Sequence, residues 1–420
     1  MVSSAKAQHE WRTRCLPLMC SDNVTSPTAR ALLASDFHGR YSNSHGDGLF
    51  NGNRYIEQVD EVATELAKRL FGAGFVEIHS PSAMVACRSP ILALAKPNDV
   101  IASLVPKDGG FPTVQGFQQF PSIVPSLRAS RIPFDANEMN IDTDAAIKQI
   151  RKEKPRMIVL GATVFLFPHP VAEIAEVARE TKSIVIYDAA QVFGLVAGKQ
   201  FQQPFEEGAD IITGSTHKTL PGPQGGLVLI KDDRKMAEEI TAVQHATTGC
   251  GQSNLWAAQA ILFAEMLEFG QDYAREVVKN AKALAGALSK RGFSVVAENR
   301  GFTQSHMVVI NVSKMGGSYA VGKILDKAGI TATPSGIPGI DEVLYGGKIS
   351  GLRFGPEEAV RIGMGVSEMD AAAEFVARAL IRKEDPRTIS RDIAEFRREY
   401  QTIHYSFDEG LPAYAYPSAQ

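Results

Sequence analysis

The sequence predicts an α/β protein in which a large domain built on a mostly parallel β-sheet is followed by a smaller α+β domain. Short apolar runs alternate with helical or turn-rich stretches between residues 99 and 230, which is typical of buried parallel strands joined by crossover helices. A helix-rich stretch then leads to a second set of strands and helices. The length of 420 residues also exceeds what one hydrophobic core normally organises, so two domains are expected.

The first long element is an amphipathic helix, because apolar residues recur at helical spacing from Ile56 to Leu70 and stop before Gly72. The apolar runs that follow predict five strands of the large sheet: Asp99–Val105, Arg156–Gly161, Ser183–Tyr187, Asp210–Thr213 and Gly226–Ile230. The segment Val171–Thr181 is read as a crossover helix between them. This part of the chain is therefore α/β.

The second half begins with a helix-rich stretch, Asn254–Lys290, in which Asp272–Leu288 is expected to connect the two domains. Strands are predicted at Phe293–Val296, Met307–Asn311 and Gly351–Phe354, with helices near 318–328 and 367–382. The Pro-, Ala- and Tyr-rich end from Tyr405 onward is expected to be an irregular tail on the surface. The predicted divisions are an N-terminal arm (1–40), the large domain (41–285), the small domain (286–395) and the tail (396–420).

Charge and composition favour small-molecule chemistry. The formal net charge is −3 with 22% charged residues, so we expect neither a nucleic-acid groove nor a membrane surface. No apolar run has the length of a membrane span, and the N-terminus lacks the apolar region of a signal peptide. The four cysteines are scattered without a Cys-x-x-Cys pair, which favours reduced thiols, no metal site and a cytoplasmic location.

Lys218 and Asp188 are the first candidates for catalysis. Lys218 lies between a predicted strand and a Pro-Gly-Pro-Gln-Gly-Gly loop. A lysine that forms an imine needs a restrained backbone and a site that favours its neutral amine. Asp188 ends another predicted strand, and a carboxylate there can pair with a protonated pyridinium nitrogen, which makes such a ring an electron sink.

The segment Thr213–Gly226 closely resembles the active-site lysine segment of serine hydroxymethyltransferases, which are fold-type I, aspartate-aminotransferase-like enzymes that use pyridoxal 5′-phosphate (PLP). Three other segments resemble motifs of that family, and the resemblance runs from about residue 16 to 380: Cys20–Asn23 with Thr25–Pro27, Asp188–Ala197 and Gly351–Gly355. The resemblance implies a seven-stranded, mostly parallel sheet in the large domain, a Schiff base between Lys218 and PLP, and a homodimer.

The same resemblance assigns roles to further residues. Cofactor contacts are implied for Ser80, Ser82, Phe111, Thr163, Asp188, Gln191, Ser215, His217 and Lys218. Hydroxyls and backbone N–H groups before the helical stretch Ala83–Ala95 suit the phosphate. Arg353 is expected to clamp the substrate carboxylate with its planar fork. Ser21 and Tyr41 are the other expected substrate contacts, and Tyr41 and Phe111 join Lys218 and Asp188 as candidate catalytic residues.

Three departures from the family pattern affect proton transfer. Phe111 stands where the family has a histidine over the PLP ring, and it stacks but cannot transfer a proton. Gln191 replaces the histidine of the aspartate motif. The stretch after Tyr41 lacks the family's glutamate; Asn43, His45 and Asp47 are the polar residues nearby. These departures argue against ordinary use of tetrahydrofolate; PLP is the expected cofactor, and tetrahydrofolate stays open as a second one.

A second resemblance points to the L-threonine transaldolase branch of this family. The matching segments are Gly251–Asn254, Met266–Tyr273, Gly301–His306 and Tyr405–Asp408. Enzymes of that branch remove an aldehyde from a β-hydroxy amino acid and add another aldehyde, and some relatives act on α-methylserine. The substrate partners implied are therefore an amino acid and an aldehyde.

The leading hypothesis is a PLP-dependent enzyme that cleaves or forms the Cα–Cβ bond of a β-hydroxy-α-amino acid. The sequence leaves open whether the carbanion takes up a proton, a second aldehyde or a folate-borne carbon. Two alternatives remain. One is another Cα reaction, of the aminotransferase, racemase or decarboxylase type; the other is a fold-type I protein without catalysis.

Overall fold

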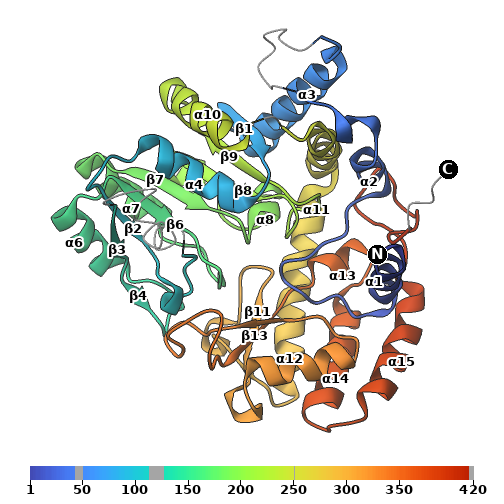
Figure 1. Cartoon of the computed structure of the whole chain (residues 1–420). Coiled ribbons are helices and arrows are strands. Elements are labelled where there is room, and N and C mark those ends of the chain that lie inside the picture. Colours follow the sequence, from blue (N-terminus) through green and yellow to red (C-terminus); the bar gives the residue numbers. More distant parts are fainter. Residues whose placement is uncertain (43–50, 113–126, 250, 416–420) are drawn as a thin grey trace.

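The computed structural model describes residues 1–42, 51–112, 127–249 and 251–415. Figure 1 shows a large unit around a seven-stranded sheet and a smaller unit, drawn in orange and red, around a four-stranded sheet. Helices cover the faces of the large sheet. The predicted fold class, an α/β protein with a mostly parallel seven-stranded sheet and a smaller α+β part, is confirmed.

The large sheet has the strand order β1-β9-β8-β7-β6-β2-β3. Its strands are β1 (Phe75–Ser80), β2 (Val100–Ser103), β3 (Arg128–Arg131), β6 (Met157–Leu160), β7 (Ile184–Asp188), β8 (Ile211–Ser215) and β9 (Gly226–Ile230). The five strands from β8 to β3 are parallel. Parallel neighbours place their carboxyl ends at one edge of the sheet, and this is where α/β proteins usually bind ligands.

One expectation for this sheet is wrong, because β9 is antiparallel to β8 and also to β1. The connection between β8 and β9 covers residues 216–225 and contains no helix. Parallel neighbours require a crossover of a dozen or more residues, so this shorter connection turns the chain straight back. The loop that carries Lys218 is thereby held between two paired strands.

In the described part of the large unit, the helices that pack around this sheet are α3 (Arg54–Phe71), α4 (Ala83–Leu94), α6 (Thr143–Glu153), α7 (Val171–Thr181), α8 (Phe193–Ala197), α9 (Pro204–Glu207) and α10 (Arg234–Thr248). The short pair β4 (Phe134–Asp135) and β5 (Asn140–Ile141) lies outside the main sheet. Helix α3 ends where predicted, at Gly72, whose φ of 65° is left-handed. Two buried apolar clusters, one containing Phe193 and one containing Ile186, fill the core.

Gly161, directly after β6, allows that strand to approach β7 closely. Its φ is +121°, and a Cβ at this position would lie 2.2 Å from the backbone oxygen of Asp188. We expect Gly161→Ala to lower the free energy of unfolding by about 1–3 kcal/mol, because the added methyl group overpacks the strand ends. Urea unfolding measures this change.

The matched control is Gly286→Ala in the long helix α11 (Ser253–Lys290), since a Cβ at Gly286 meets nothing within 4 Å. That variant should be as stable as the parent or more stable, because alanine favours the helix by about 0.5–1 kcal/mol. Equal stability of the two variants would contradict the close approach at Gly161.

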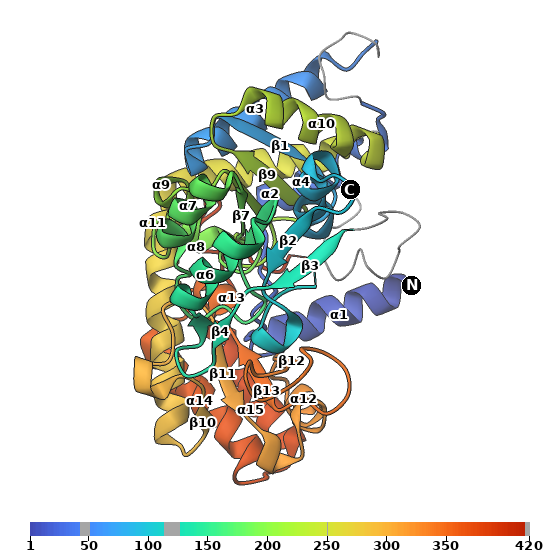
Figure 2. The same ribbon diagram turned by 90° about the vertical axis from the view of Figure 1, so that its left-hand side faces the viewer.

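Helix α11 (Ser253–Lys290) is one continuous element of 38 residues. Its first part, with Trp256 and Phe263, packs in the core of the large unit, and its last part, with Leu284 and Leu288, packs in the core of the small unit. Figure 2 shows it running along one side of the molecule through both units. The predicted connecting helix, Asp272–Leu288, is therefore the second half of a longer helix.

The small sheet has the order β10-β11-β13-β12, and all its pairs are antiparallel. Its strands are β10 (Ser294–Val295), β11 (Val308–Asn311), β12 (Thr333–Ser335) and β13 (Gly351–Phe354). The helices around it are α12 (Ser318–Lys327), α13 (Glu357–Arg361), α14 (Val366–Leu380) and α15 (Pro386–Phe396). Strand β13 is important for the site because it carries Arg353.

Both ends of the described chain pack against the small unit. The N-terminal segment holds α1 (Val2–Arg14) and α2 (Pro27–Leu33). Leu16 and Leu18 lie in the same buried cluster as Ile403 and Ala413. Residues 405–415 contain no helix or strand, as predicted. Among the described residues, none of the helices combines the length and apolar character needed to cross a membrane.

Buried polar contacts fix the C-terminal segment to α11 and α13. Arg361 donates to Glu265 (2.6 Å), and both side chains are 1% exposed. Ser406 donates to the other oxygen of the same carboxylate (2.6 Å), and Arg361 also donates to the backbone oxygen of Tyr405. The tail is therefore bound to the core and does not lie loosely on the surface.

Candidate active site

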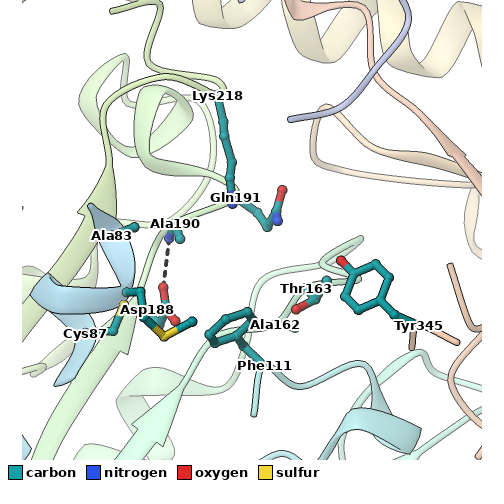
Figure 3. Close-up of a pocket in the computed structure, with 11 residues that line it drawn as sticks. Ala83, Cys87, Phe111, Ala162, Thr163, Asp188, Ala190, Gln191, Lys218 and Tyr345 are labelled. Carbon is teal, nitrogen blue, oxygen red and sulfur yellow. Dashed lines mark hydrogen bonds between the residues drawn. The ribbon is translucent and has the colours of Figure 1, made fainter. Parts of the chain in front are cut away.

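A pocket lies where the carboxyl ends of β6, β7 and β8 meet the small unit. It is lined by Ala83, Met84, Cys87, Phe111, Ala162, Thr163, Asp188, Ala190, Gln191, Lys218 and Tyr345. Figure 3 shows Lys218 on one side of this pocket, with Phe111, Thr163 and Tyr345 on the other. The sequence-predicted residues Lys218, Asp188, Phe111, Thr163 and Gln191 are thus brought together.

Lys218 projects from the tight connection between β8 and β9. Asn23 donates to the Lys218 backbone oxygen (2.6 Å) and to the Tyr273 hydroxyl (2.8 Å). Thr216 donates to the oxygen of Pro223 (2.5 Å), which closes the loop on itself. Burial lowers the pKa of Lys218, and the nearby Asp188 carboxylate opposes that shift. The backbone restraint that imine formation requires is present, and the lowered pKa of Lys218 favours the neutral amine.

Asp188 is the last residue of β7 and is 8% exposed. The N–H of Ala190 donates to its Oδ1 (3.0 Å), which fixes the carboxyl group. Burial raises the pKa of Asp188, since few groups nearby solvate its charge. A cationic ring nitrogen against this carboxylate would stabilise the ionised form.

Ser80, Ser82, Ser215 and His217 lie around the other end of the lysine loop. Ser80 of β1 and Ser215 of β8 both pair with Gly226 of β9, so their backbones flank it. Ser82 caps α4 by accepting from the N–H of Val85 (3.4 Å). Gly226 lies against this cap, because a Cβ there would be 2.6 Å from the Ser82 oxygen. Hydroxyls and a helix N-terminus therefore gather in one place.

Four buried polar atoms near the pocket have no hydrogen-bond partner among the described residues: Ser80 Oγ, Gln191 Oε1, His217 Nδ1 and Arg353 Nε. Burial, with a smaller effect from Lys218, lowers the pKa of His217 to about 4, so its imidazole is neutral. Ser215 instead donates to the oxygen of Ala190 (2.7 Å). Buried polar atoms in folded proteins are nearly always paired, so these four atoms indicate a polar ligand.

Arg353 reaches the same region from the small unit. Its side chain is buried, and it donates to the backbone oxygen of Thr163 (2.6 Å) and to the hydroxyl of Tyr345 (2.9 Å). The Tyr345 ring centroid lies 5.9 Å from the guanidinium carbon. Arg353, the predicted carboxylate clamp, is therefore held next to the pocket by Thr163 of the large unit and Tyr345 of the small unit.

Arg353 adjoins the pocket without lining it, and the other two predicted substrate contacts, Tyr41 and Ser21, do not line it either. Tyr41 is 59% exposed, and its backbone oxygen accepts from Asn53 (2.8 Å). Ser21 is partly buried and follows Cys20, which is packed against Gly355. The loop polar residues Asn43, His45 and Asp47 lie outside the described residues.

The structure adds two pocket residues that the sequence reasoning missed. The Cys87 sulfur lies 3.2 Å from the Thr213 hydroxyl, and burial raises its pKa well above the ordinary value, so it is a neutral thiol beside Asp188. Tyr345 comes from the connection between β12 and β13. Neither residue belongs to a recognisable motif; only their position in the folded chain reveals them.

Tyr345→Phe should raise the KM for the amino-acid substrate by about 2- to 10-fold with little change in kcat. The phenol accepts a hydrogen bond from Arg353, and such a bond is worth about 0.5–1.5 kcal/mol. Without it the guanidinium is less well oriented for a carboxylate. Steady-state kinetics separates the two constants.

Tyr55→Phe is the matched control, because Arg54 donates to the Tyr55 hydroxyl (2.7 Å) in an exposed contact on α3. Its KM should equal that of the parent. A lower KM in Tyr345→Phe would contradict the orienting role, because the phenol would then be a competitor of the substrate.

Comparison with known proteins identifies the family of the whole chain. The serine hydroxymethyltransferase family model matches residues 1–376. Serine hydroxymethyltransferase of Methanopyrus kandleri is 40% identical over 99% of this chain and 97% of its own length. That of Thermococcus kodakarensis is 42% identical over 96% and 95%. The crystal structure of L-threonine transaldolase from Pseudomonas fluorescens superposes with a TM-score of 0.89 at 26% identity, covering 97% of this chain and 93% of that one.

Proposed function

This chain belongs to the serine hydroxymethyltransferase family, and on that premise we propose that Lys218, Asp188 and Arg353 are the central residues of its active site. The protein is a PLP-dependent enzyme that cleaves or forms the Cα–Cβ bond of a hydroxy amino acid. Lys218 and Asp188 line the same pocket, and Arg353 donates hydrogen bonds to Thr163 and Tyr345, which also line it. This observation supports the residue assignment.

The residues present fit PLP. Asp188 suits the ring nitrogen, Phe111 the ring face and Thr163 and Gln191 its polar edge. The buried atoms Ser80 Oγ and His217 Nδ1, with no partner among the described residues, suit the phosphate together with Ser82 and Ser215 beside the α4 N-terminus. When bound, PLP supplies an electron sink for negative charge at the substrate α-carbon.

The chain's own groups perform the remaining tasks. Lys218 would attach the cofactor through Nζ, and burial, which lowers the pKa of this amine, favours its neutral form. Arg353 binds the substrate carboxylate and so orients the Cα–Cβ bond. The neutral Lys218 amine can then accept the proton of the β-hydroxyl group or return one to the α-carbon. Phe111 covers the site without titrating.

The fate of the α-carbon separates hydroxymethyl transfer from transaldolation. Phe111 and Gln191 both line the pocket and cannot transfer protons, which favours an acceptor that needs little acid–base help from these two positions. An aldehyde is such an acceptor, and the structural similarity to the L-threonine transaldolase supports it. The alternative is hydroxymethyl transfer, in which tetrahydrofolate accepts the one-carbon unit released from the substrate and the α-carbon takes up a proton, as the family implies.

The test incubates the protein with L-threonine, L-serine or α-methylserine, with and without tetrahydrofolate and an acceptor aldehyde. Aldehyde release that depends on an acceptor aldehyde supports transaldolation, and glycine formation that depends on folate supports hydroxymethyl transfer. Stoichiometric keto-acid formation without aldehyde release would overturn both.

We further propose a homodimer in the cytoplasm. The exposed Tyr41, assigned to a substrate site that it does not line within its own chain, is explained if a second subunit completes that site. Light scattering tests the dimer. The free thiols of Cys15, Cys20 and Cys87 suit a reducing compartment.

A further inference from the structure

Glu77, His79 and His245 form a cluster outside the active-site pocket. Glu77 and His79 belong to the edge strand β1, and His245 lies near the end of α10. One possible ligand atom from each residue lies within 4.8 Å of the other two. Figure 1 shows α3, β1 and α10 side by side at one end of the large unit. We propose that this cluster binds a divalent transition-metal ion.

Both ring nitrogens of His79 are hydrogen-bonded to carboxylates in the structure. Its Nδ1 lies 2.5 Å from Glu77 Oε1, and its Nε2 lies 2.9 Å from Asp60 Oδ1. A ligating histidine typically binds the metal with one nitrogen and donates from the other to a carboxylate, which fixes the ring. A metal ion bound at Nδ1 would replace the proton that this nitrogen shares with Glu77, and Asp60 of α3, which pairs with Nε2, would then be the supporting carboxylate.

The surroundings provide access and a negative field. A surface groove between α3, β1 and α10 is lined by Glu77 and His79, with the carboxylates of Asp60, Glu61 and Glu65 on its rim. His245 lines the adjoining hollow. The side chains of Glu77 and His79 are 3% and 10% exposed, so the ligands are held in place while the groove leaves room for water or a fourth ligand.

The donor set defines the class of ion. One carboxylate and two imidazoles suit zinc and its neighbours in the transition series, and not calcium or magnesium, which prefer oxygen ligands alone. A simple carboxylate–imidazole–carboxylate clamp would need only Asp60, His79 and Glu77. His245 is the residue whose presence distinguishes a metal site from that clamp.

A bound ion would connect β1 to α10 just before the phosphate end of the active site. His79 immediately precedes Ser80, and α10 packs on α4, whose first turn is capped by Ser82. This metal site is independent of the aldol reaction itself, so its test needs no activity measurement.

The experiment uses the full chain with PLP bound, treated with chelator and titrated with CoCl₂. The chain has two tryptophans; in a Trp11→Phe background the emission comes from Trp256, whose ring centroid is 4.6 Å from that of His79. We expect saturable quenching at one cobalt ion per chain, visible d–d absorption of the bound ion, and reversal by EDTA or by competing zinc.

Three variants locate the site. His245→Gln should weaken cobalt binding by about 100-fold or more through loss of a ligand, and Asp60→Asn by about 10- to 100-fold through loss of the supporting carboxylate. The control His404→Gln removes a different histidine, 3.3 Å from Glu409, and should bind like the parent. Absence of quenching in the Trp11→Phe protein, or undiminished binding in His245→Gln, would overturn the proposal. The test variants His245→Gln and Asp60→Asn leave the buried ligands Glu77 and His79 in place, so misfolding does not obscure the result.

Discussion

Lys218→Ala is expected to lower kcat/KM for aldol cleavage by a factor on the order of 10³ or more, the range found when a covalent catalytic residue is removed. In the structure Lys218 lines the same pocket as Asp188, and burial gives its amine a lowered pKa. No other lysine lines that pocket among the described residues. The variant should also leave added PLP with the absorbance of the free aldehyde.

The control for Lys218→Ala is Lys282→Ala, which removes an exposed lysine from α11. It should keep both the activity and the absorbance of the bound cofactor. Thermal melting of both variants without cofactor verifies that they fold. Retention of substantial cleavage activity by a folded Lys218→Ala protein would refute the assignment of this residue.

Glu265→Ala should lower the free energy of unfolding by roughly 3–5 kcal/mol, the usual effect of removing one partner of a buried ion pair. Glu265 accepts from Arg361 and from Ser406, each at 2.6 Å, and Arg361 is 1% exposed. Without the carboxylate, the guanidinium is left buried with the Tyr405 oxygen as its remaining acceptor. The urea midpoint of the apoprotein measures the loss.

The comparison variant is Glu180→Ala. It removes a similar carboxylate–arginine pair, with two contacts of 2.9 Å to Arg151, but both side chains are about half exposed. Exposed pairs contribute little to stability, so its midpoint should change far less. Equal shifts in the two variants would show that burial of the Arg361–Glu265 pair does not matter.

Much of the fold follows from local patterns. The helix at Val171–Thr181 and the strands at Gly226–Ile230 and Gly351–Phe354 have the predicted bounds, because their apolar residues all face a core. Strand β1 was missed because Glu77 and His79 interrupt its apolar pattern. The two side chains pair with each other, and Asp60 of the preceding helix α3 pairs with His79, which the sequence pattern does not reveal. Helix α1 has no buried residue and hence no apolar face to reveal it.

The candidate site was predictable where a motif identifies it and not where the tertiary fold assembles it. Lys218, Asp188 and Phe111 carry motif signals and meet in the pocket. Cys87 and Tyr345 reach it only because α4 and the β12–β13 connection close around it. The domain limits given by sequence are also local. Since Leu16 and Ala413 share the core of the small unit, whereas Phe37 packs against the core of the large unit, we propose that residues 16–24 and 396–415 fold with residues 286–395.

Helix α11 has a mechanical consequence for the reaction. At about 1.5 Å per residue its 38 residues extend for about 57 Å, and one end is anchored beneath the unit that bears Lys218 while the other supports the sheet that bears Arg353. A slight tilt of this helix would move the Arg353 guanidinium relative to Lys218 by a distance comparable to the length of a hydrogen bond. The distance between a cofactor held by Lys218 and the Arg353 guanidinium can therefore depend on the orientation of helix α11. A substrate that contacts both would fix that orientation.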